Sequence, residues 1–413
     1  MHEHPHTPQE QISAVRFDLR PLLFCNLTTT IAMAAFGALI GPIARTLGLA
    51  PWQAGTAVTV AGLLWLLLAR AWGVASDRHG RRRILLLGSA GVALSYAALS
   101  LFIGMALQLL PATLLTFIGL LVGRALVGAF YAALPAAGQA LIADQVAAGQ
   151  RAGAIASLGA ANALGMVIGP ALAAWLSRYS LALPLYLMVL LPLLGSLALW
   201  RFMPLAPQPA AQQQPPPRLA DPRLRQPLLI AFLAMFCVSV SQITVGFFAL
   251  DQLHLTAAEA AQAAGIALAL VGIALITSQL LVRQLRWPPL RLLRIGTWGA
   301  ASGFLATCAV AHDWQLWLAF FVAAAGMGWI FPAFAAWAAD AVEPHEQGAA
   351  AGSLGAAQGL GLVLGPLAGS LMYGLDPRLP YLVISLLLLL TALWLMQLRP
   401  QHLAAQATSS PVP

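Results

Sequence analysis

The sequence contains no lysine, and only 13 of its 413 residues are acidic. Charged residues make up 8% of the chain, whereas a soluble domain carries about 25%. With 60% hydrophobic residues, the chain could not bury its apolar surface in water, so lipid must be the solvent for most of it. Arginine supplies every basic side chain, and we attribute the absence of lysine to coding bias.

Cysteine is also scarce, and Cys25, Cys237 and Cys308 each lie in an apolar run with no metal or disulfide spacing. The polar first twenty residues lack the apolar core and cleavage site of a secretory signal, so we expect the first apolar segment to be retained. No Walker-type glycine loop is present. We therefore expect no cofactor, no metal site and no enzymatic activity. The net charge of +8 does not indicate nucleic-acid binding, because the arginines form short clusters between apolar runs.

Long apolar segments fill most of the chain and are separated by short polar breaks. A helix needs about 20 apolar residues to cross a bilayer. Each segment reaches that length, and we predict twelve transmembrane helices. The predicted spans cover residues 21–44, 54–76, 84–107, 111–134, 152–175, 181–203, 227–250, 261–284, 292–311, 314–338, 349–373 and 379–398.

The longest break, residues 204–226, is dominated by proline and glutamine and reads as a semi-rigid linker. It divides the spans into a first bundle, 21–203, and a second bundle, 227–398, flanked by tails at 1–20 and 399–413. Arginine gathers in cytoplasmic connections of membrane proteins. Here it gathers on the side of the N-terminus, so we expect both termini in the cytoplasm of a bacterial cell, with the protein in the inner membrane as a monomer.

The two halves of the sequence resemble each other. The segment "LGAANALGMVIGP", which ends at Pro170, and "LGAAQGLGLVLGP", which ends at Pro366, agree at nine of thirteen positions. In the same register Asp144 matches Asp340. Chance similarity between helices rich in Gly, Ala and Leu does not explain the matching acids. Parallel repeats of this kind predict an all-α membrane protein of two pseudo-symmetric six-helix bundles that rock about a central site.

Charge is concentrated between the second and third spans, in "GVASDRHGRRR", residues 73–83. Gly73 allows another helix to approach the second span closely. Asp77 ends that span, where the free N–H groups of a neighbouring helix N-terminus would attract it. A plain cytoplasmic anchor would explain the arginines, but not the acid or the glycines.

This stretch resembles the loop signature of the major facilitator superfamily, and the chain is similar over nearly its whole length to that family's twelve-span drug:proton antiporter branch. The resemblance implies a latch that holds the two bundles together in the outward-open state. It implies that Asp77 engages the start of the eleventh span near Gly352 and Ser353, and that Arg81 reaches Asp144. The residues assigned to the latch are Gly73, Asp77, Arg78, Gly80, Arg81, Arg82 and Asp144.

Arg124 lies inside the fourth span, where an arginine costs about 2.5–3.5 kcal/mol on insertion scales. It should therefore face a cavity, and the resemblance implies a role in proton coupling; pairing with backbone carbonyls for packing is the alternative. No acid falls clearly within a membrane core. Asp251, at the outer end of the seventh span, is the nearest candidate for a proton site.

The fifth span partly matches the antiporter signature of that helix, with Ala173 and Ala174 in place of its closing glycines. Glycines four residues apart allow close helix contact, and proline kinks the span. A generic kinked helix would carry the same features. The residues assigned to packing and kinking are Gly165, Gly169, Pro170, Gly361, Gly365 and Pro366.

Polar and aromatic side chains in the middle of spans are candidates for a substrate cavity, although each alone could be a packing residue. They are Asn26, Asn162, Gln242, Gln279, Trp329, Phe334, Trp337 and Gln358. Amides and aromatics without an acid suit neutral, amphipathic or anionic substrates better than strongly cationic ones.

These features predict a secondary active transporter, a proton-coupled exporter of small amphipathic molecules such as drugs or a metabolite of the siderophore kind. Its partners would be the small-molecule substrate, protons and the lipid bilayer, with no nucleic acid. An importer on the same fold is the alternative. A membrane receptor or scaffold that transports nothing is a third reading.

Overall fold

The computed structural model describes residues 18–146, 148–203, 221–285, 287–343 and 346–397, and these residues form helices joined by short connections. In lipid, a helix satisfies its backbone N–H and C=O groups within one segment, which explains why this apolar sequence folds this way. The α-helices of the first half are α1 (Arg20–Thr46), α2 (Pro51–His79), α3 (Arg81–Leu109), α4 (Thr113–Tyr131), α5 (Ala133–Gln145), α6 (Ala148–Leu176) and α7 (Ala182–Phe202). Those of the second half are α8 (Arg225–Gln252), α9 (Ala257–Leu285), α10 (Pro289–Thr307), α11 (Asp313–Asp340), α12 (Gln347–Leu375) and α13 (Leu379–Gln397), preceded by the 3₁₀ turn η1 (Pro222–Leu224).

Eleven helices of the described residues are long and apolar enough to cross a membrane, which makes the chain a multi-pass membrane protein. The prediction for the fourth span was too short. It ended at residue 134, but α4 continues into α5 with a single break at Ala132, so that this span runs from Thr113 to Gln145. Pro135 explains why the backbone hydrogen bonds of the helix are interrupted while the span continues, because proline removes only one backbone N–H donor. Helix α10 is not among the eleven, since Arg291 and Arg294 occupy its first two turns.

Helix ends follow local sequence signals. Pro51 begins α2, where its missing N–H is no loss, and the Gln53 side chain accepts a hydrogen bond from the N–H of Ala50 at 2.8 Å. Gly80 separates α2 from α3 with φ of +93°, which a residue with a Cβ rarely adopts. The glycine inside the charged stretch is therefore required by the sharp turn between the two helices.

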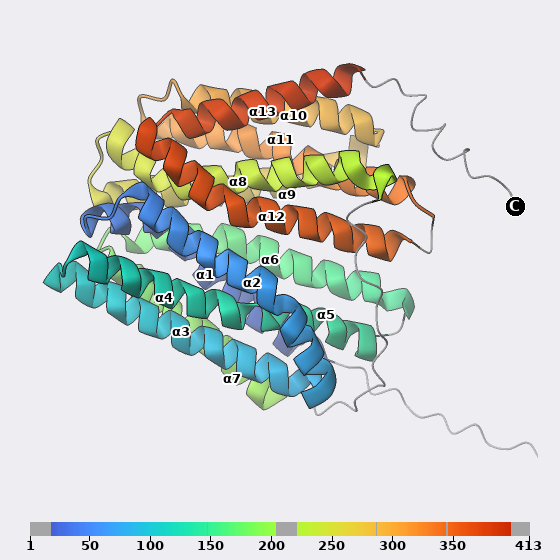
Figure 1. Cartoon of the computed structure of the whole chain (residues 1–413), viewed down its shortest axis with the longest axis horizontal. Helices are drawn as coiled ribbons and strands as arrows, with labels where there is room; N and C mark the ends of the chain where they lie inside the picture. Colours follow the sequence, from blue (N-terminus) through green and yellow to red (C-terminus); the bar gives the residue numbers. More distant parts are fainter. Residues whose placement is uncertain (1–17, 147, 204–220, 286, 344–345, 398–413) are drawn as a thin grey trace, which may run out of the picture.

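The two halves of the chain lie side by side, with α1–α7 in the lower part of Figure 1 and α8–α13 in the upper part. Within the first half, α1 packs on α6 and α7, and α4 packs on α2 and α3. Within the second half, α8 packs on α12, and α10 packs on α11 and α13. Contacts between the halves join α6 to α9, α12 to α2, and α1 to both α8 and α9.

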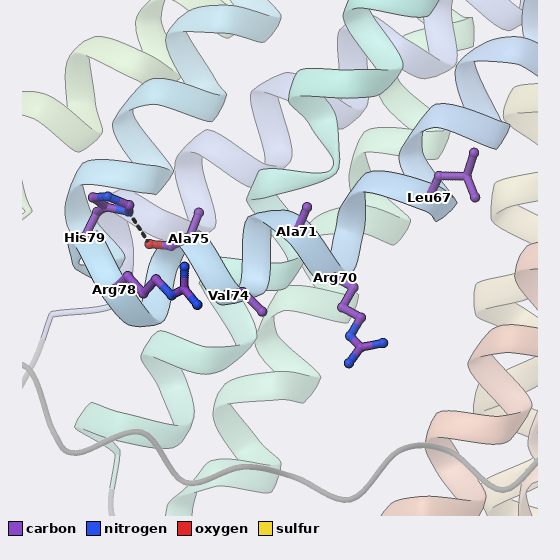
Figure 2. A pocket seen from close by; sticks show the side chains of 7 residues that line it. All are labelled: Leu67, Arg70, Ala71, Val74, Ala75, Arg78 and His79. Atoms are coloured by element: carbon purple, nitrogen blue, oxygen red, sulfur yellow. Dashed lines mark hydrogen bonds between the residues drawn. The ribbon is translucent and has the colours of Figure 1, made fainter.

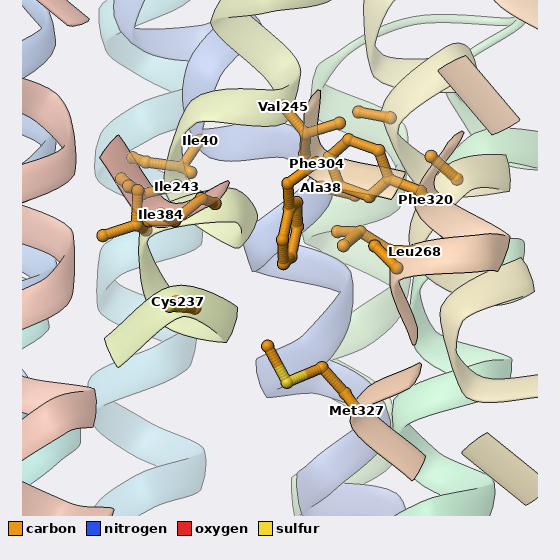
Figure 3. Close-up of a cluster of buried hydrophobic side chains, with 14 of the residues drawn as sticks. Ala38, Ile40, Cys237, Ile243, Val245, Leu268, Phe304, Phe320, Met327 and Ile384 are labelled. Carbon is orange, nitrogen blue, oxygen red and sulfur yellow. The ribbon is translucent and has the colours of Figure 1, made fainter. Parts of the chain in front are cut away.

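Buried apolar side chains form one large cluster that includes residues of both halves. Figure 3 shows part of it, where Ala38 and Ile40 of α1 lie near Ile243 and Val245 of α8. The helices have two common ends. We call the end at which α2 passes into α3 the Asp77 end, and the end at which α1 and α8 finish the Asp251 end.

The predicted linker and tails fall mainly on residues 204–220, 1–17 and 398–413, which lie outside the described residues. The described part resumes with η1, and α8 begins at Arg225, so helical structure starts slightly before the predicted boundary at residue 227.

Candidate functional site: two ends and a buried arginine

At the Asp77 end, one arginine joins three helices of the first half. Arg81, the first residue of α3, forms an ion pair with Asp77 of α2 and donates from Nε to Oδ2 of Asp144 in α5 at 2.8 Å. A third bond runs from Arg81 to the hydroxyl of Ser76 at 2.6 Å. The Arg81 and Asp144 side chains are each only 17% exposed, so water screens this pair weakly. The predicted reach of Arg81 to Asp144 is present in the structure.

Arg82 also joins helices of the first half, through hydrogen bonds to the end of α7. Its Nε donates to the carbonyl of Met203 at 2.8 Å, and NH2 donates to the carbonyl of Trp200 at 2.9 Å. These bonds satisfy carbonyls at the end of α7, which have no partner within the helix. The two arginines therefore hold α2, α3, α5 and α7 together.

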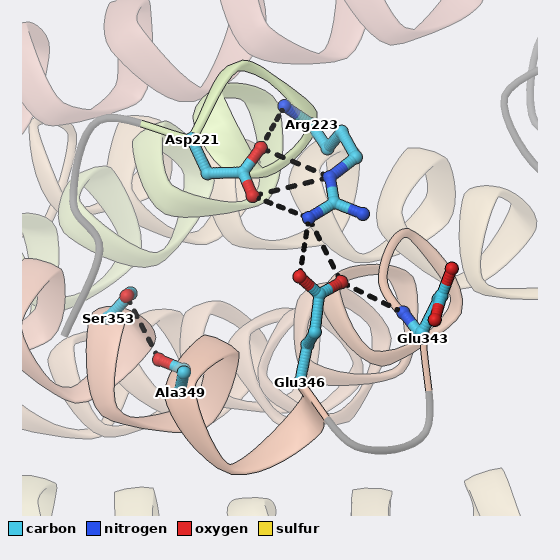
Figure 4. Close-up of polar contacts among 6 residues, drawn as sticks. All are labelled: Asp221, Arg223, Glu343, Glu346, Ala349 and Ser353. Atoms are coloured by element: carbon cyan, nitrogen blue, oxygen red, sulfur yellow. Dashed lines mark hydrogen bonds and ion pairs between the residues drawn. The ribbon is translucent and has the colours of Figure 1, made fainter. Parts of the chain in front are cut away.

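The recorded ion pair of Asp77 is with Arg81, and among the described residues no recorded polar contact joins Asp77 to α12, the helix that contains Gly352 and Ser353. The hydroxyl of Ser353 instead donates within its own helix, to the carbonyl of Ala349 at 3.0 Å (Figure 4). Gly73 on α2 and Gly355 on α12 each face open space on the Cβ side, because a methyl group added at either would meet nothing within 4 Å. The two halves are parted here, and the predicted engagement of Asp77 with the start of α12 stays a prediction.

The parted face of α2 is lined by apolar and cationic side chains. A hollow of about 490 Å³ lies on it, bordered by Leu67, Val74, Arg70 and Arg78. Figure 2 shows Arg70 and Arg78 on the surface of α2, directed away from its packed side. Neither has a recorded ion-pair partner among the described residues. Arg70 was not among the residues predicted for the site.

Across the opening, the start of α12 carries its own charge cluster. Arg223 of η1 pairs with Asp221 at 2.8 Å and with Glu346, the residue before α12, at 3.0 Å (Figure 4). The backbone N–H of Glu343 donates to Glu346 at 3.3 Å. These contacts tie the beginning of α8 to the beginning of α12, so each half is closed on itself at this end.

The Asp251 end is joined across the halves. Asp251 at the end of α8 forms an ion pair with Arg45 at the end of α1, and it accepts a hydrogen bond from the hydroxyl of Tyr373 in α12 at 3.0 Å. The Arg45 guanidinium also lies 5.8 Å from the centre of the Phe247 ring. The residue predicted to carry the proton is thus part of a contact between halves, and its partners Arg45 and Tyr373 were not predicted.

Glycines bring the halves together at the same end. A methyl group at Gly41 of α1 would lie 2.7 Å from the backbone nitrogen of Phe247 in α8. In addition, Thr59 of α2 donates to the carbonyl of Val363 in α12 at 3.0 Å. Such close backbone approach requires small residues, as is usual for helix contacts in lipid.

The repeated segments pack each against the first helix of its own half. A methyl group at Gly165 of α6 would lie 2.7 Å from Cβ of Thr30 in α1, and one at Gly169 would lie 2.3 Å from the carbonyl oxygen of Ile31. In the second half, a methyl group at Gly361 of α12 would lie 2.5 Å from the carbonyl oxygen of Phe232 in α8. Gly365 is equally close to α8, with 2.6 Å to Cβ of Ser239.

The prolines of the repeat face the opposite half. The carbonyl oxygen of Pro170 lies 2.6 Å from the Cβ position of Gly265 in α9, and that of Pro366 lies 2.5 Å from the Cβ position of Gly55 in α2. Both prolines lie within their helices. The same short segment therefore forms one contact within each half and one contact between halves. Gly55 and Gly265 were not identified from sequence.

The amides of the predicted cavity divide into bonded and unbonded groups. Asn26 of α1 donates from Nδ2 to Oδ1 of Asn162 in α6 at 2.9 Å and to the carbonyl of Leu158 at 3.3 Å, and Thr30 donates to the same Asn162 oxygen at 2.8 Å. This network borders a cavity of about 180 Å³ between α1, α5 and α6. Thr30 was not predicted.

The other predicted cavity residues lie elsewhere. Gln242 and Gln358 are partly buried and Gln279 is exposed, without recorded hydrogen bonds. Phe334 and Trp337 are buried in the large apolar cluster. Trp329 packs edge-on against Trp287, with 5.8 Å between ring centres.

Arg124 of α4 is a partly buried cation that contacts α1 within the first half. Its guanidinium lies over the Phe36 ring of α1 at 4.6 Å, and NH1 approaches Sδ of Met33 at 3.9 Å. Nε is buried without a hydrogen-bond partner. A cation–π contact contributes about 0.5–2 kcal/mol, which offsets only part of the cost of a central arginine, about 2.5–3.5 kcal/mol. The described part of the chain contains no group of three His, Cys, Asp or Glu side chains arranged to hold a metal.

Apolar helices in this arrangement, with a partly buried cation and polar groups between them, are typical of a membrane transporter fold. The model of the Major Facilitator Superfamily matches residues 22–303 and 264–412, and the chain belongs to that family. No curated protein matches the chain in sequence.

Solved transporters share the fold at low sequence identity. A bacterial homolog of the human lysosomal transporter Spinster, inward-facing and unoccupied, is similar with a TM-score of 0.73 and 16% identity over 95% of this chain and 98% of that one. A bacterial homologue of the iron transporter ferroportin, inward-facing, gives 0.69 and 17% over 94% and 98%. The human organic anion transporter MFSD10 gives 0.63 and 20% over 94% and 100%.

Proposed function

We propose that this chain is a secondary active transporter that works by alternating access and exports small amphipathic molecules in exchange for protons. The observation that carries the proposal is the difference between the two ends. Contacts between the halves are made at the Asp251 end, while glycines at the Asp77 end face open space. A chain of two such halves can exchange which end is closed.

The proposal includes a particular topology. Twelve helices form two pseudo-symmetric six-helix bundles, 21–203 and 227–398, with α4 and α5 counted as one span and α10 included. The Asp77 end and both termini face the cytoplasm, because arginine favours that side. The protein acts as a monomer in the inner membrane of a bacterial cell. A reporter active only outside the cytoplasm should be active when fused near Arg178 and inactive when fused after Pro400.

Two groups of residues take different roles in this cycle. The latch residues close the Asp77 end when Asp77 leaves Arg81 and engages the start of α12. Arg124 and Asp251 couple transport to protons, with Asp251 exchanging its proton as the contact with Arg45 and Tyr373 breaks and reforms. The ion pair at Asp251 and the absence of an acid partner for Arg124 among the described residues support these assignments.

Dye transport into everted membrane vesicles tests the proposal. Vesicles that carry the protein should accumulate a neutral or anionic amphipathic dye when a pH gradient is imposed, and nigericin should abolish the uptake. Vesicles with Arg124→Ala should lose uptake while keeping normal amounts of protein. Accumulation by right-side-out vesicles alone would favour an importer, and wild-type uptake by Arg124→Ala would remove Arg124 from the mechanism.

A further inference from the structure

Arg124 has more hydrogen-bond donors than neighbours to receive them. A guanidinium carries five N–H donors in a planar fork and stays charged in proteins. Around Arg124 one donor meets only the weak acceptor Sδ of Met33, the guanidinium carbon lies over the Phe36 ring, and Nε has no hydrogen-bond partner. The described acids all lie at helix ends or in connections, so none neutralises this charge. An oxyanion is the group that would satisfy both the charge and the fork.

The α1 face beside Arg124 offers further polar groups. Asn26, Thr30, Met33 and Gly37 follow one another at helical spacing, and a methyl group at Gly37 would meet nothing within 4 Å. Asn26 and Met33 are separated by about 10 Å along the helix axis. The Asn162 oxygen receives two hydrogen bonds, which leaves the Asn162 Nδ2 donors and the Asn26 Oδ1 acceptor unused.

The hollow on α2 at the Asp77 end is bordered by positive charge, as Arg124 is positive deeper in the first half. Arg70 and Arg78 border the hollow on α2 without a recorded acid partner among the described residues. Asp77, the acid nearest to them in sequence, is engaged by Arg81, as is Asp144. A small anion entering along α2 would therefore meet favourable charge before it reached Arg124.

We infer that the transported molecule is an amphipathic organic anion whose acidic group binds Arg124 over Phe36, with a polar group about 10 Å away at Asn26 and Asn162. This inference rests on the proposed transport function and specifies its substrate class. A carboxylate, sulfonate or phosphate monoester on an apolar body fits the site. A cation would bring a second positive charge to a site that has no acid.

Binding to the purified full-length protein in dodecyl maltoside tests the inference without requiring transport. The probes are 2-naphthoate, 2-naphthalenesulfonate and 2-naphthyl phosphate, with 2-naphthamide and 2-naphthylmethylammonium as uncharged and cationic controls. A ligand that binds the folded state raises the melting temperature, so the thermal shift at several concentrations reports affinity. At least one anion should bind about tenfold more tightly than the amide, which corresponds to the strength of a charge-assisted bond.

Variants separate recognition from structure. Arg124→Gln should bind the best anion and the amide equally, while Arg124→Lys should retain part of the preference because the charge survives without the fork. Arg70→Gln should keep the preference for the anion, since Arg70 borders the hollow on α2 and not the site at Arg124. Adding a distant hydroxyl, as in 6-hydroxy-2-naphthoate, should improve binding to the wild type but not to Asn162→Ala.

Two results would overturn the inference. One is a wild-type protein that prefers no anion over the amide, and the other is an Arg124→Gln variant that keeps the preference. Neither result would contradict the proposed transport by alternating access, which the vesicle assay measures separately. Conversely, anion binding without dye transport would uphold the site and count against the export cycle.

Discussion

Both ends of this transporter are held by ion pairs, but the pairs lie within a half at one end and between the halves at the other. At the Asp77 end, the ion pairs of Arg81 and Arg223 each join helices of one half, and the halves are parted. At the Asp251 end, the ion pair of Asp251 joins one half to the other. The difference shows that charge can either make a half rigid or tie the halves together, depending on which helices its partners come from.

Glycine contacts divide in the same way. Gly165 and Gly361 pack within their halves, whereas Gly55 and Gly265 face the proline carbonyls of the opposite half. The first pair should matter for folding. The second pair should matter for which end is closed.

The largest effect is expected from blocking the contact between halves. In Gly55→Leu the new Cβ would lie 1.9 Å from the Ser370 hydroxyl and 2.5 Å from the Pro366 carbonyl oxygen, so the Asp251 end could not close as it does here. Transport in proteoliposomes should fall at least tenfold, and a cysteine at Thr59 should become accessible from the Asp251 end. Gly374→Leu is the matched control, because a side chain there meets open space. Equal transport by the two variants would refute this account of closure.

The next effect concerns stability within a half. Asp144→Asn removes a partner of Arg81 where both side chains are 17% exposed, and we expect a loss of about 1–3 kcal/mol in unfolding free energy. Thermal unfolding in detergent measures it. Asp340→Asn, the repeat counterpart, has no recorded ion-pair partner among the described residues and should change little. A similar loss in both variants would show that the ion pair with Arg81 is not the cause.

A smaller effect is expected at the latch. Asp77→Asn should lower transport severalfold and favour the state parted at the Asp77 end, because a charge at a helix N-terminus contributes about 0.3–2 kcal/mol. Asp77→Glu should keep part of the activity. Cysteine accessibility from each side, on a background without Cys25, Cys237 and Cys308, measures the shift. If accessibility and transport are both unchanged, the charged stretch at residues 73–83 serves only to orient the spans in the membrane, and the latch is wrong.

The smallest effect is expected from the ion pair at the Asp251 end. The Arg45 and Asp251 side chains are 42% and 30% exposed, and pairs in contact with water contribute about 0–1 kcal/mol. Arg45→Asp should shift accessibility toward an opened Asp251 end by less than about fivefold. Adding Asp251→Arg should restore the wild-type value. A double variant that stays as open as the single one would show that the pair itself does not hold this end.

The amino-acid sequence by itself determined the helices and much of their chemistry. Apolar length predicted the membrane helices, and the repeat around Pro170 and Pro366 predicted equivalent packing, because these features depend on neighbours a few residues away. The contact between Arg81 and Asp144 followed from a family resemblance. The extension of the fourth span to Gln145 was missed, since Pro135 interrupts the local pattern without ending the helix.

Only the tertiary structure decided which residues meet between the halves. The partners of Asp251 lie on α1 and α12, more than a hundred residues away in either direction, and no local pattern marks them. The same holds for Gly55 opposite Pro366 and, within the first half, for Arg124 over Phe36. Which end is closed is also not a local property, because two states of one sequence differ by only a few kcal/mol summed over such contacts.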